Sequence, residues 1–255
     1  MIALTGRITM LAALLTAVLF GVAPAAPQTA PPPKPSQCTV PPDLVASDPT
    51  LPGLAKRFHD RQPVVIVVIG GASTAGIAAG GPANAYPQRL QEALARRHPG
   101  VSITVINQGI PRQTTRDMIG RFSADVLAAK PNLVIWETGT VDAVRAVEID
   151  EFAAALDEGI TALRAGGAAV MLVNMQYNPS LDSVIDFGPY LDALNRAADL
   201  DDVYLFDRYQ IMRYWSDNGR FNVVDVPSGK QAALAGEIYR CLGETMAGAI
   251  DRAAR

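Results

Sequence analysis

Histidine is scarce in this chain of 255 residues: only His59 and His98 are present, too few for a histidine-rich metal site. Charge is also low, with 18% charged residues and a net charge of −3, and there is no run of Lys or Arg. The sequence therefore lacks the basic surface typical of a nucleic-acid-binding protein. Hydrophobic residues make up 49% of the chain, enough for a buried core, so wholesale disorder is excluded.

The first 26 residues have the order of a secretory signal peptide. Arg7 precedes a long apolar stretch, and small residues follow that stretch at positions 23–26. An uncleaved membrane anchor is the alternative, but a span needs ~20 strongly apolar residues. No other segment is long enough to cross a bilayer. We therefore expect a periplasmic or secreted mature protein without a membrane span.

Residues 27–53 are rich in proline and predict an extended spacer, followed by a folded domain over residues 54–255. Cys38 lies in this spacer and Cys241 lies near the C-terminus. In an exported protein, two cysteines more often form a disulfide than remain free. We predict a Cys38–Cys241 disulfide that pins the spacer against the last helix; two unrelated buried cysteines are the alternative.

Short apolar runs alternate with amphipathic segments after the spacer. We predict strands at 64–69, 101–106, 133–136, 168–173 and 203–206, and helices at 83–97, 114–130, 149–164, 184–198 and 231–250. This alternation predicts an α/β fold, with helices on both faces of a mostly parallel five-stranded sheet. Ligands of such sheets bind beyond the carboxyl ends of the strands. The residues there are Gly70–Gly76, Asn107–Arg112, Glu137–Asp142, Asn174–Asn178 and Asp207.

The first of these loops holds Ser73 among glycines, either as an exposed nucleophile or as part of a plain strand-to-helix turn. No Gly-Lys-Ser/Thr follows, so the loop is not a phosphate-binding P-loop. The G-x-G-x-x-G pattern of dinucleotide sites is also absent. We therefore expect no metal and no cofactor. The segment 71–75 is one residue short of the G-x-S-x-G elbow of α/β-hydrolases, but that elbow does not normally follow the first strand of the domain.

Three segments, VVIGGASTAG, VINQG and LVIWETGTVDA, together resemble the motifs of SGNH (GDSL-type) hydrolases over roughly residues 63–250. The sequence Tyr239-Arg240-Cys241 is similar to that of exported bacterial members with a loose serine motif. The resemblance implies a flavodoxin-like three-layer α/β/α sandwich. It also implies Ser73 as the nucleophile, Gly109 as the oxyanion-hole glycine, and Gly139–Asp142 as the third motif, Gly-x-Asn-Asp.

Several positions depart from this family pattern. Alanine precedes Ser73 where the family has aspartate, and Arg112 stands where a second glycine often occurs. Val141 replaces the oxyanion-hole asparagine, and losing one such donor typically costs about 10²–10³ in rate. The family takes its base from a C-terminal Asp-x-x-His, yet no histidine follows His98. Both histidines are predicted at the amino end of the sheet, away from Ser73.

Other groups could act as the base. Asp225 falls in one alignment of the last motif and Lys230 in another. A carboxylate such as Asp142 or Asp225, with an ordinary pKa of ~4, is a poor base for a serine unless burial raises that pKa. A desolvated lysine could form a Ser-Lys dyad. Thr140, Asp142 and Gln176 are further candidates for substrate binding, Gln176 because its polar loop suits a carbohydrate.

Two functions agree with these motifs. The first is an exported domain with a degenerate site, weakly catalytic or non-catalytic, which binds an envelope glycan or a partner protein. The second is an active serine ester hydrolase, a deacetylase or acyl esterase, that uses Ser73 with a base other than histidine. Because losing a triad member typically leaves only ~10³–10⁴ of rate enhancement over water, the sequence favours the first.

Overall fold

The computed structural model describes residues 37–46 and 49–255; the predicted signal peptide and the first part of the spacer lie outside them. The sheet is entirely parallel, with strand order β2-β1-β3-β4-β5. Its strands are β1 (Val64–Gly70), β2 (Ile103–Gly109), β3 (Leu133–Glu137), β4 (Ala169–Val173) and β5 (Tyr204–Phe206). The α-helices are α1 (Pro52–His59), α2 (Ala72–Ala75), α3 (Tyr86–Arg97), α4 (Thr115–Ile119), α5 (Thr140–Val144), α6 (Ile149–Ala165), α7 (Pro179–Asp182), α8 (Gly188–Asp201), α9 (Arg208–Asp217) and α10 (Gln231–Ala253).

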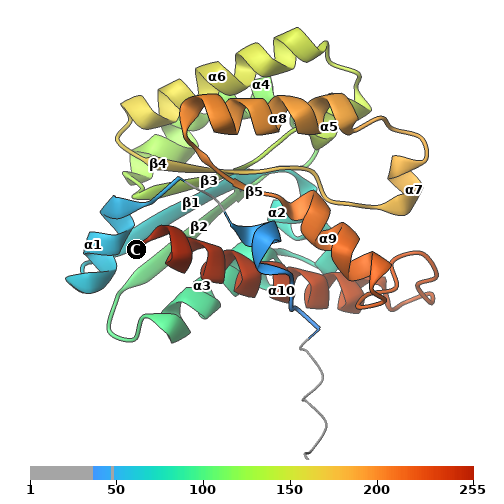
Figure 1. The fold of residues 1–255 in the computed structure, drawn as a ribbon, viewed down its shortest axis with the longest axis horizontal. Helices are drawn as coiled ribbons and strands as arrows, with labels where there is room; N and C mark the ends of the chain where they lie inside the picture. Colours follow the sequence, from blue (N-terminus) through green and yellow to red (C-terminus); the bar gives the residue numbers. More distant parts are fainter. Residues whose placement is uncertain (1–36, 47–48) are drawn as a thin grey trace, which may run out of the picture. The chain divides into compact units, whose positions relative to one another are not determined.

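The sheet separates two hydrophobic layers (Figure 1). Helices α3 and α10 pack together on one face, and α6 packs with α8 and α4 on the other. Strands β1 and β3 lie in the middle and are buried on both faces, which explains their continuous β-branched and apolar runs. The predicted three-layer α/β/α sandwich is therefore confirmed.

Strand register brings distant residues to one edge of the sheet. Gly70 pairs with Gly109, so the first two strands end side by side. Glu137 pairs with Val173, which in turn pairs with Phe206. The segments that follow β1, β3 and β5 consequently meet at the same carboxyl edge, where ligands of such sheets bind.

The predicted helix over 114–130 is interrupted in the structure. It consists of α4, a π-helical turn η4 (Phe122–Val126) and a 3₁₀ turn η5 (Leu127–Ala129). Met118, Phe122 and Val126 are all buried at a spacing of four residues. A spacing of four exceeds the 3.6 residues of an α-helical turn, and the wider π turn keeps these side chains on the core side.

Two helices begin well after their predicted starts. Helix α8 begins at Gly188 rather than at 184, because Pro189 in its first turn favours a helix start. Helix α3 begins at Tyr86, after the 3₁₀ turn η3 (Pro82–Asn84). In both cases the hydrophobic pattern begins several residues before the backbone signal that starts the helix.

The predicted Cys38–Cys241 disulfide is present in the structure and joins residues 203 positions apart. Around it, the 3₁₀ turn η1 (Pro42–Val45) lies against the domain. The Val45 carbonyl accepts a hydrogen bond from the Tyr204 hydroxyl at 2.8 Å, and the Leu51 amide donates to the Ala253 carbonyl at 2.7 Å. Part of the predicted spacer therefore packs on the domain. No helix among the described residues is long and apolar enough to span a membrane.

Candidate functional site

Ser73 lies in the short helix α2, directly beyond the carboxyl end of β1. Its side chain is nearly buried, and its hydroxyl has two protein partners. The hydroxyl donates to Glu137 Oε1 at 2.7 Å and accepts from Arg208 Nη1 at 2.8 Å. The candidate nucleophile is thus held between a carboxylate and a guanidinium.

Glu137 and Arg208 form a buried ion pair, with Arg208 Nη2 at 3.3 Å from Glu137 Oε1. Their side chains are only 6% and 1% exposed. Glu137 ends β3, and Arg208 starts α9 just after β5, so the sheet register brings them together. Asp207 caps α9 by accepting from the Gln210 amide, which fixes the start of the helix that carries Arg208. Buried charges require such pairing because isolated ones are too costly to desolvate.

Hydroxyl groups complete the surroundings of Glu137. The Thr74 hydroxyl donates to Glu137 Oε2, and the Tyr86 hydroxyl lies 2.8 Å from Thr74 Oγ1. Burial, followed by the negative charge of Glu137, raises the pKa of Tyr86 well above its ordinary value. The same two causes raise the pKa of Tyr239 to about 12. Both phenols stay protonated near neutral pH, so neither can serve as a base there.

Ser73 and Glu137 line a cavity of about 620 Å³. Apolar groups from Ile77, Pro111 and Val141 form part of its wall, and polar groups from Arg112, Thr140 and Gln176 form another part. This Ser73 cavity therefore offers both apolar surface and hydrogen-bonding groups beside the serine, a combination common in ligand sites.

The structure brings together three of the residues singled out in the sequence: Ser73, Thr140 and Gln176 all line the cavity. Gly109 lies at the end of β2, and its amide donates to Asn107 Oδ1 at 2.9 Å. Asp142 is buried, and both of its carboxylate oxygens accept from the Thr115 amide. Burial raises the pKa of Asp142, against the opposing effect of these hydrogen bonds.

Asp225 and Lys230 are both exposed, and neither lines the Ser73 cavity. The histidines lie elsewhere too: His98 Nε2 is 2.7 Å from Asp251 Oδ1, and His59 Nδ1 is 2.8 Å from Asp60 Oδ1. The only hydrogen-bond partners of the Ser73 hydroxyl among the described residues are Glu137 and Arg208.

Gly109 is packed against the helix that carries Ser73. A β-carbon at this position would lie 2.3 Å from the Ala75 amide nitrogen and 2.6 Å from the Thr74 carbonyl carbon. We predict that Gly109→Ala lowers the free energy of unfolding by about 1–3 kcal/mol, because backbone atoms must move. Urea denaturation measures this change. Gly236→Ala is the matched control: its site on α10 is open, so stability should hold or rise by up to ~1 kcal/mol. Equal stabilities of the two variants would refute the close packing.

No sequence motif identified the roles of Glu137 and Arg208. One signal was available: Glu137 directly follows the apolar run Leu133–Trp136, and a charge at the end of a buried strand needs a partner. Nothing in the local sequence identified Arg208 as that partner, because the two positions are 71 residues apart.

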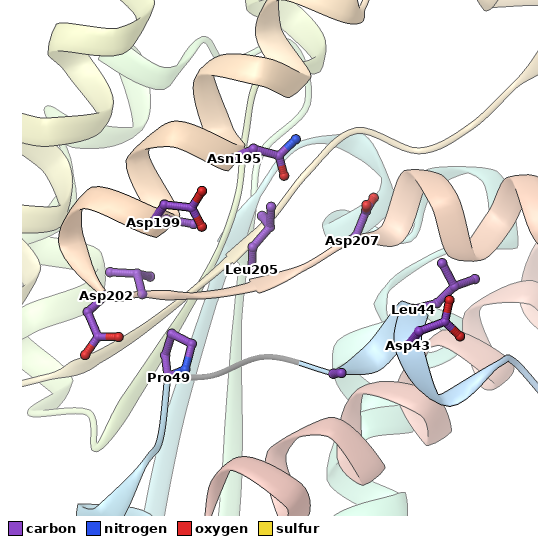
Figure 2. A pocket seen from close by; sticks show the side chains of 11 residues that line it. Asp43, Leu44, Pro49, Asn195, Asp199, Asp202, Leu205 and Asp207 are labelled. Carbon is purple, nitrogen blue, oxygen red and sulfur yellow. The ribbon is translucent and has the colours of Figure 1, made fainter.

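A separate cavity of about 510 Å³ lies between η1, the end of α8 and β5 (Figure 2). Asp43, Asp199, Asp202 and Asp207 line it, and it shares no lining residue with the Ser73 cavity. Among the described residues, no group of three or more His, Cys, Asp or Glu side chains is arranged to hold a metal ion.

Several solved structures share the fold of this chain. Solved structures with this fold include a lipase/acylhydrolase from Enterococcus faecalis, with 20% identity, a TM-score of 0.57, and coverage of 69% of this chain and 93% of that one. An acetyl xylan esterase, AlAXEase, has 19% identity, a TM-score of 0.59, and coverage of 73% and 100%. A two-domain esterase active on acetylated mannans, co-crystallised with mannopentaose, has 19% identity, a TM-score of 0.64, and coverage of 80% and 55%.

The chain belongs to the Non-GDSL lipase-like family, which matches residues 37–255. The resemblance to SGNH-type hydrolases is thereby confirmed. No curated protein matches the sequence.

Proposed function

We propose that this protein is an exported glycan-binding member of its family, which holds an ester-bearing envelope polysaccharide in the Ser73 cavity and hydrolyses it weakly or not at all. The observation that carries this proposal is the hydrogen bonding of Ser73. Its proton is directed to Glu137, and one of its oxygen lone pairs accepts from Arg208. No imidazole is available to take the proton during attack on a carbonyl carbon.

The surroundings of Ser73 also lack two donors that an acyl-transfer reaction would use. Val141 has no hydrogen-bond donor in its side chain, and the Gly109 amide already donates to Asn107. An oxyanion formed at Ser73 would therefore lose stabilisation that typically amounts to about 10²–10³ in rate for each donor. Binding needs neither of these donors.

A carbohydrate ester suits the mixed lining of the cavity. Arg112, Thr140 and Gln176 can hydrogen-bond sugar hydroxyls, while Ile77 and Val141 can contact an acyl group. Esterases of this fold that act on acetylated xylan and acetylated mannan make the same ligand class a reasonable choice for this chain. The disulfide supports an oxidising compartment, such as the periplasm or the exterior.

A second candidate function is ester hydrolysis with Glu137 as the base, favoured by the 2.7 Å hydrogen bond from Ser73. In this reaction the Ser73 proton passes to Glu137 while Oγ bonds the acyl carbon. The proton then goes to the departing alcohol. In the second step water attacks the acyl carbon and gives a proton to Glu137, which passes it to Ser73 as the acyl group leaves. Arg208 would stabilise the serine oxygen as its negative charge develops.

Two measurements on the purified protein test the proposal. Titration calorimetry with acetylated xylo-oligosaccharides and acetylated manno-oligosaccharides should detect binding of at least one of them. Hydrolysis of p-nitrophenyl acetate by the wild type should exceed that by Ser73→Ala only slightly or not at all. Rapid turnover that Ser73→Ala abolishes would instead establish the hydrolase function, and no binding of either probe would refute the glycan-binding function.

A further inference from the structure

A third cavity, of about 660 Å³, lies beyond the carboxyl ends of β4 and β5. It is formed by the segment 182–188 and by α9, and its lining includes Asp182, Asp186, Phe187, Tyr209, Gln210 and Arg213. We propose that this α9 cavity is a second sugar subsite, which binds an unesterified unit of the same polysaccharide whose ester group enters the Ser73 cavity. This inference rests on the proposed function and extends it from a single site to an oligosaccharide.

The two cavities share no lining residue, but residues adjacent along the chain connect their surroundings. Arg208 bonds Ser73, and the next residue along α9, Tyr209, lines the α9 cavity. Gln176 lines the Ser73 cavity, and the next residue, Tyr177, contacts Tyr209 edge to face with ring centroids 5.5 Å apart. Two pairs of adjacent residues thus connect the sites, so one extended ligand can reach both.

Asp182 supplies an acceptor that lacks a partner. Its Oδ2 accepts from the Tyr209 hydroxyl at 2.5 Å, whereas its Oδ1 is buried and has no hydrogen bond among the described residues. Leaving a buried polar atom unsatisfied costs about 1–3 kcal/mol. Because this oxygen is buried, Asp182 must turn toward the cavity before a ligand hydroxyl can donate to it and remove that cost. Burial and the bond to Asp182 raise the pKa of Tyr209 to about 12, so this phenol remains a protonated donor that holds the carboxylate in place.

The remaining lining has the chemistry of a pyranose site. Gln210 and Arg213 provide donors, and Asp182 and Asp186 provide acceptors. Tyr209 and the 73% exposed side chain of Val184 provide apolar surface for the C–H groups of a sugar ring. Because carboxylates and a guanidinium both face this cavity, a neutral ligand rich in hydroxyls fits better than a purely anionic or cationic one.

The test compares short and long ligands. Titration calorimetry is run with acetylated disaccharides and acetylated hexasaccharides of the xylan and mannan series. We expect Asp182→Asn and Arg213→Ala each to weaken binding of the hexasaccharide about tenfold, equivalent to ~1.4 kcal/mol, and to leave disaccharide binding unchanged. Tyr209→Phe, which removes the hydroxyl that holds Asp182, should weaken the hexasaccharide in the same way and keeps the ring.

Asp199→Asn is the matched control, because Asp199 lines the separate cavity of Figure 2 and should leave both affinities unchanged. Wild-type affinity for the hexasaccharide in all three α9-cavity variants would overturn the second subsite and leave the proposed function intact. Failure of the wild-type protein to bind any of the four probes would overturn both.

Discussion

Glu137→Ala is expected to lower the free energy of unfolding by about 3–5 kcal/mol. The substitution leaves the buried guanidinium of Arg208 without its counter-charge, and breaking a buried ion pair from one side typically costs this much. It also removes the acceptor for the Ser73 and Thr74 hydroxyls. Urea denaturation followed by circular dichroism measures the change.

Further variants distinguish the loss of the ion pair from other effects of the substitution. Arg208→Met leaves the buried carboxylate of Glu137 without its counter-charge. The double variant Glu137→Ala with Arg208→Met should lose less unfolding free energy than the two single variants lose together. Glu158→Ala is a surface control, since Glu158 pairs with Arg116 while both remain about half exposed. Exposed pairs typically contribute only about 0.2–1 kcal/mol. A Glu137→Ala effect as small as that of Glu158→Ala would rule out a structural ion pair at the site.

Removing the disulfide is the second large effect we expect. Replacing Cys38 and Cys241 by alanine should lower the free energy of unfolding by about 2–5 kcal/mol, because the cross-link restricts a very long segment of the unfolded chain. Chemical denaturation under oxidising conditions measures the difference from the wild type.

Reduction provides the control for this prediction. A reducing agent should shift the wild-type unfolding midpoint toward that of the double alanine variant, and it should not change the midpoint of the variant itself. If the oxidised wild type and the variant unfold at the same denaturant concentration, the link does not stabilise the fold.

The fold could be predicted because its central strands are buried on both faces and consist mainly of β-branched and other apolar residues. Val64–Gly70 and Leu133–Glu137 show this directly. Helix boundaries were harder to predict. The run over 114–130 has apolar residues at a helical spacing, yet the core selects a π turn within it. The sequence pattern reports which side chains are buried, but packing decides the local turn.

The candidate site was only half predictable. A glycine-rich segment after the first strand identified Ser73, and the Asn174–Asn178 loop identified Gln176. The ion pair of Glu137 and Arg208 depends on β3 and β5 ending at the same edge, with β4 between them. Such a pairing arises from tertiary register, so no local motif could reveal it.

The scarcity of histidine acquires a physical meaning from this ion pair. His98 stacks on Phe58 with ring centroids 3.8 Å apart and lies near Asp251, so neither its position nor its contacts serve the site. Glu137, and not an imidazole, accepts the Ser73 proton, while Arg208, a permanently charged donor, occupies a lone pair of the serine oxygen. The serine is therefore held by an ion pair and lacks the histidine that usually activates it.

Labelling with a fluorophosphonate tests the central claim most directly, because this reagent modifies serine hydroxyls that act as nucleophiles. Attack by Ser73 Oγ would expel fluoride and leave a phosphonyl group on the serine. We predict that intact-mass and peptide mass spectrometry find Ser73 unmodified after prolonged incubation of the folded protein. A phosphonyl adduct on Ser73, absent from Ser73→Ala, would contradict the account and establish Ser73 as an active nucleophile.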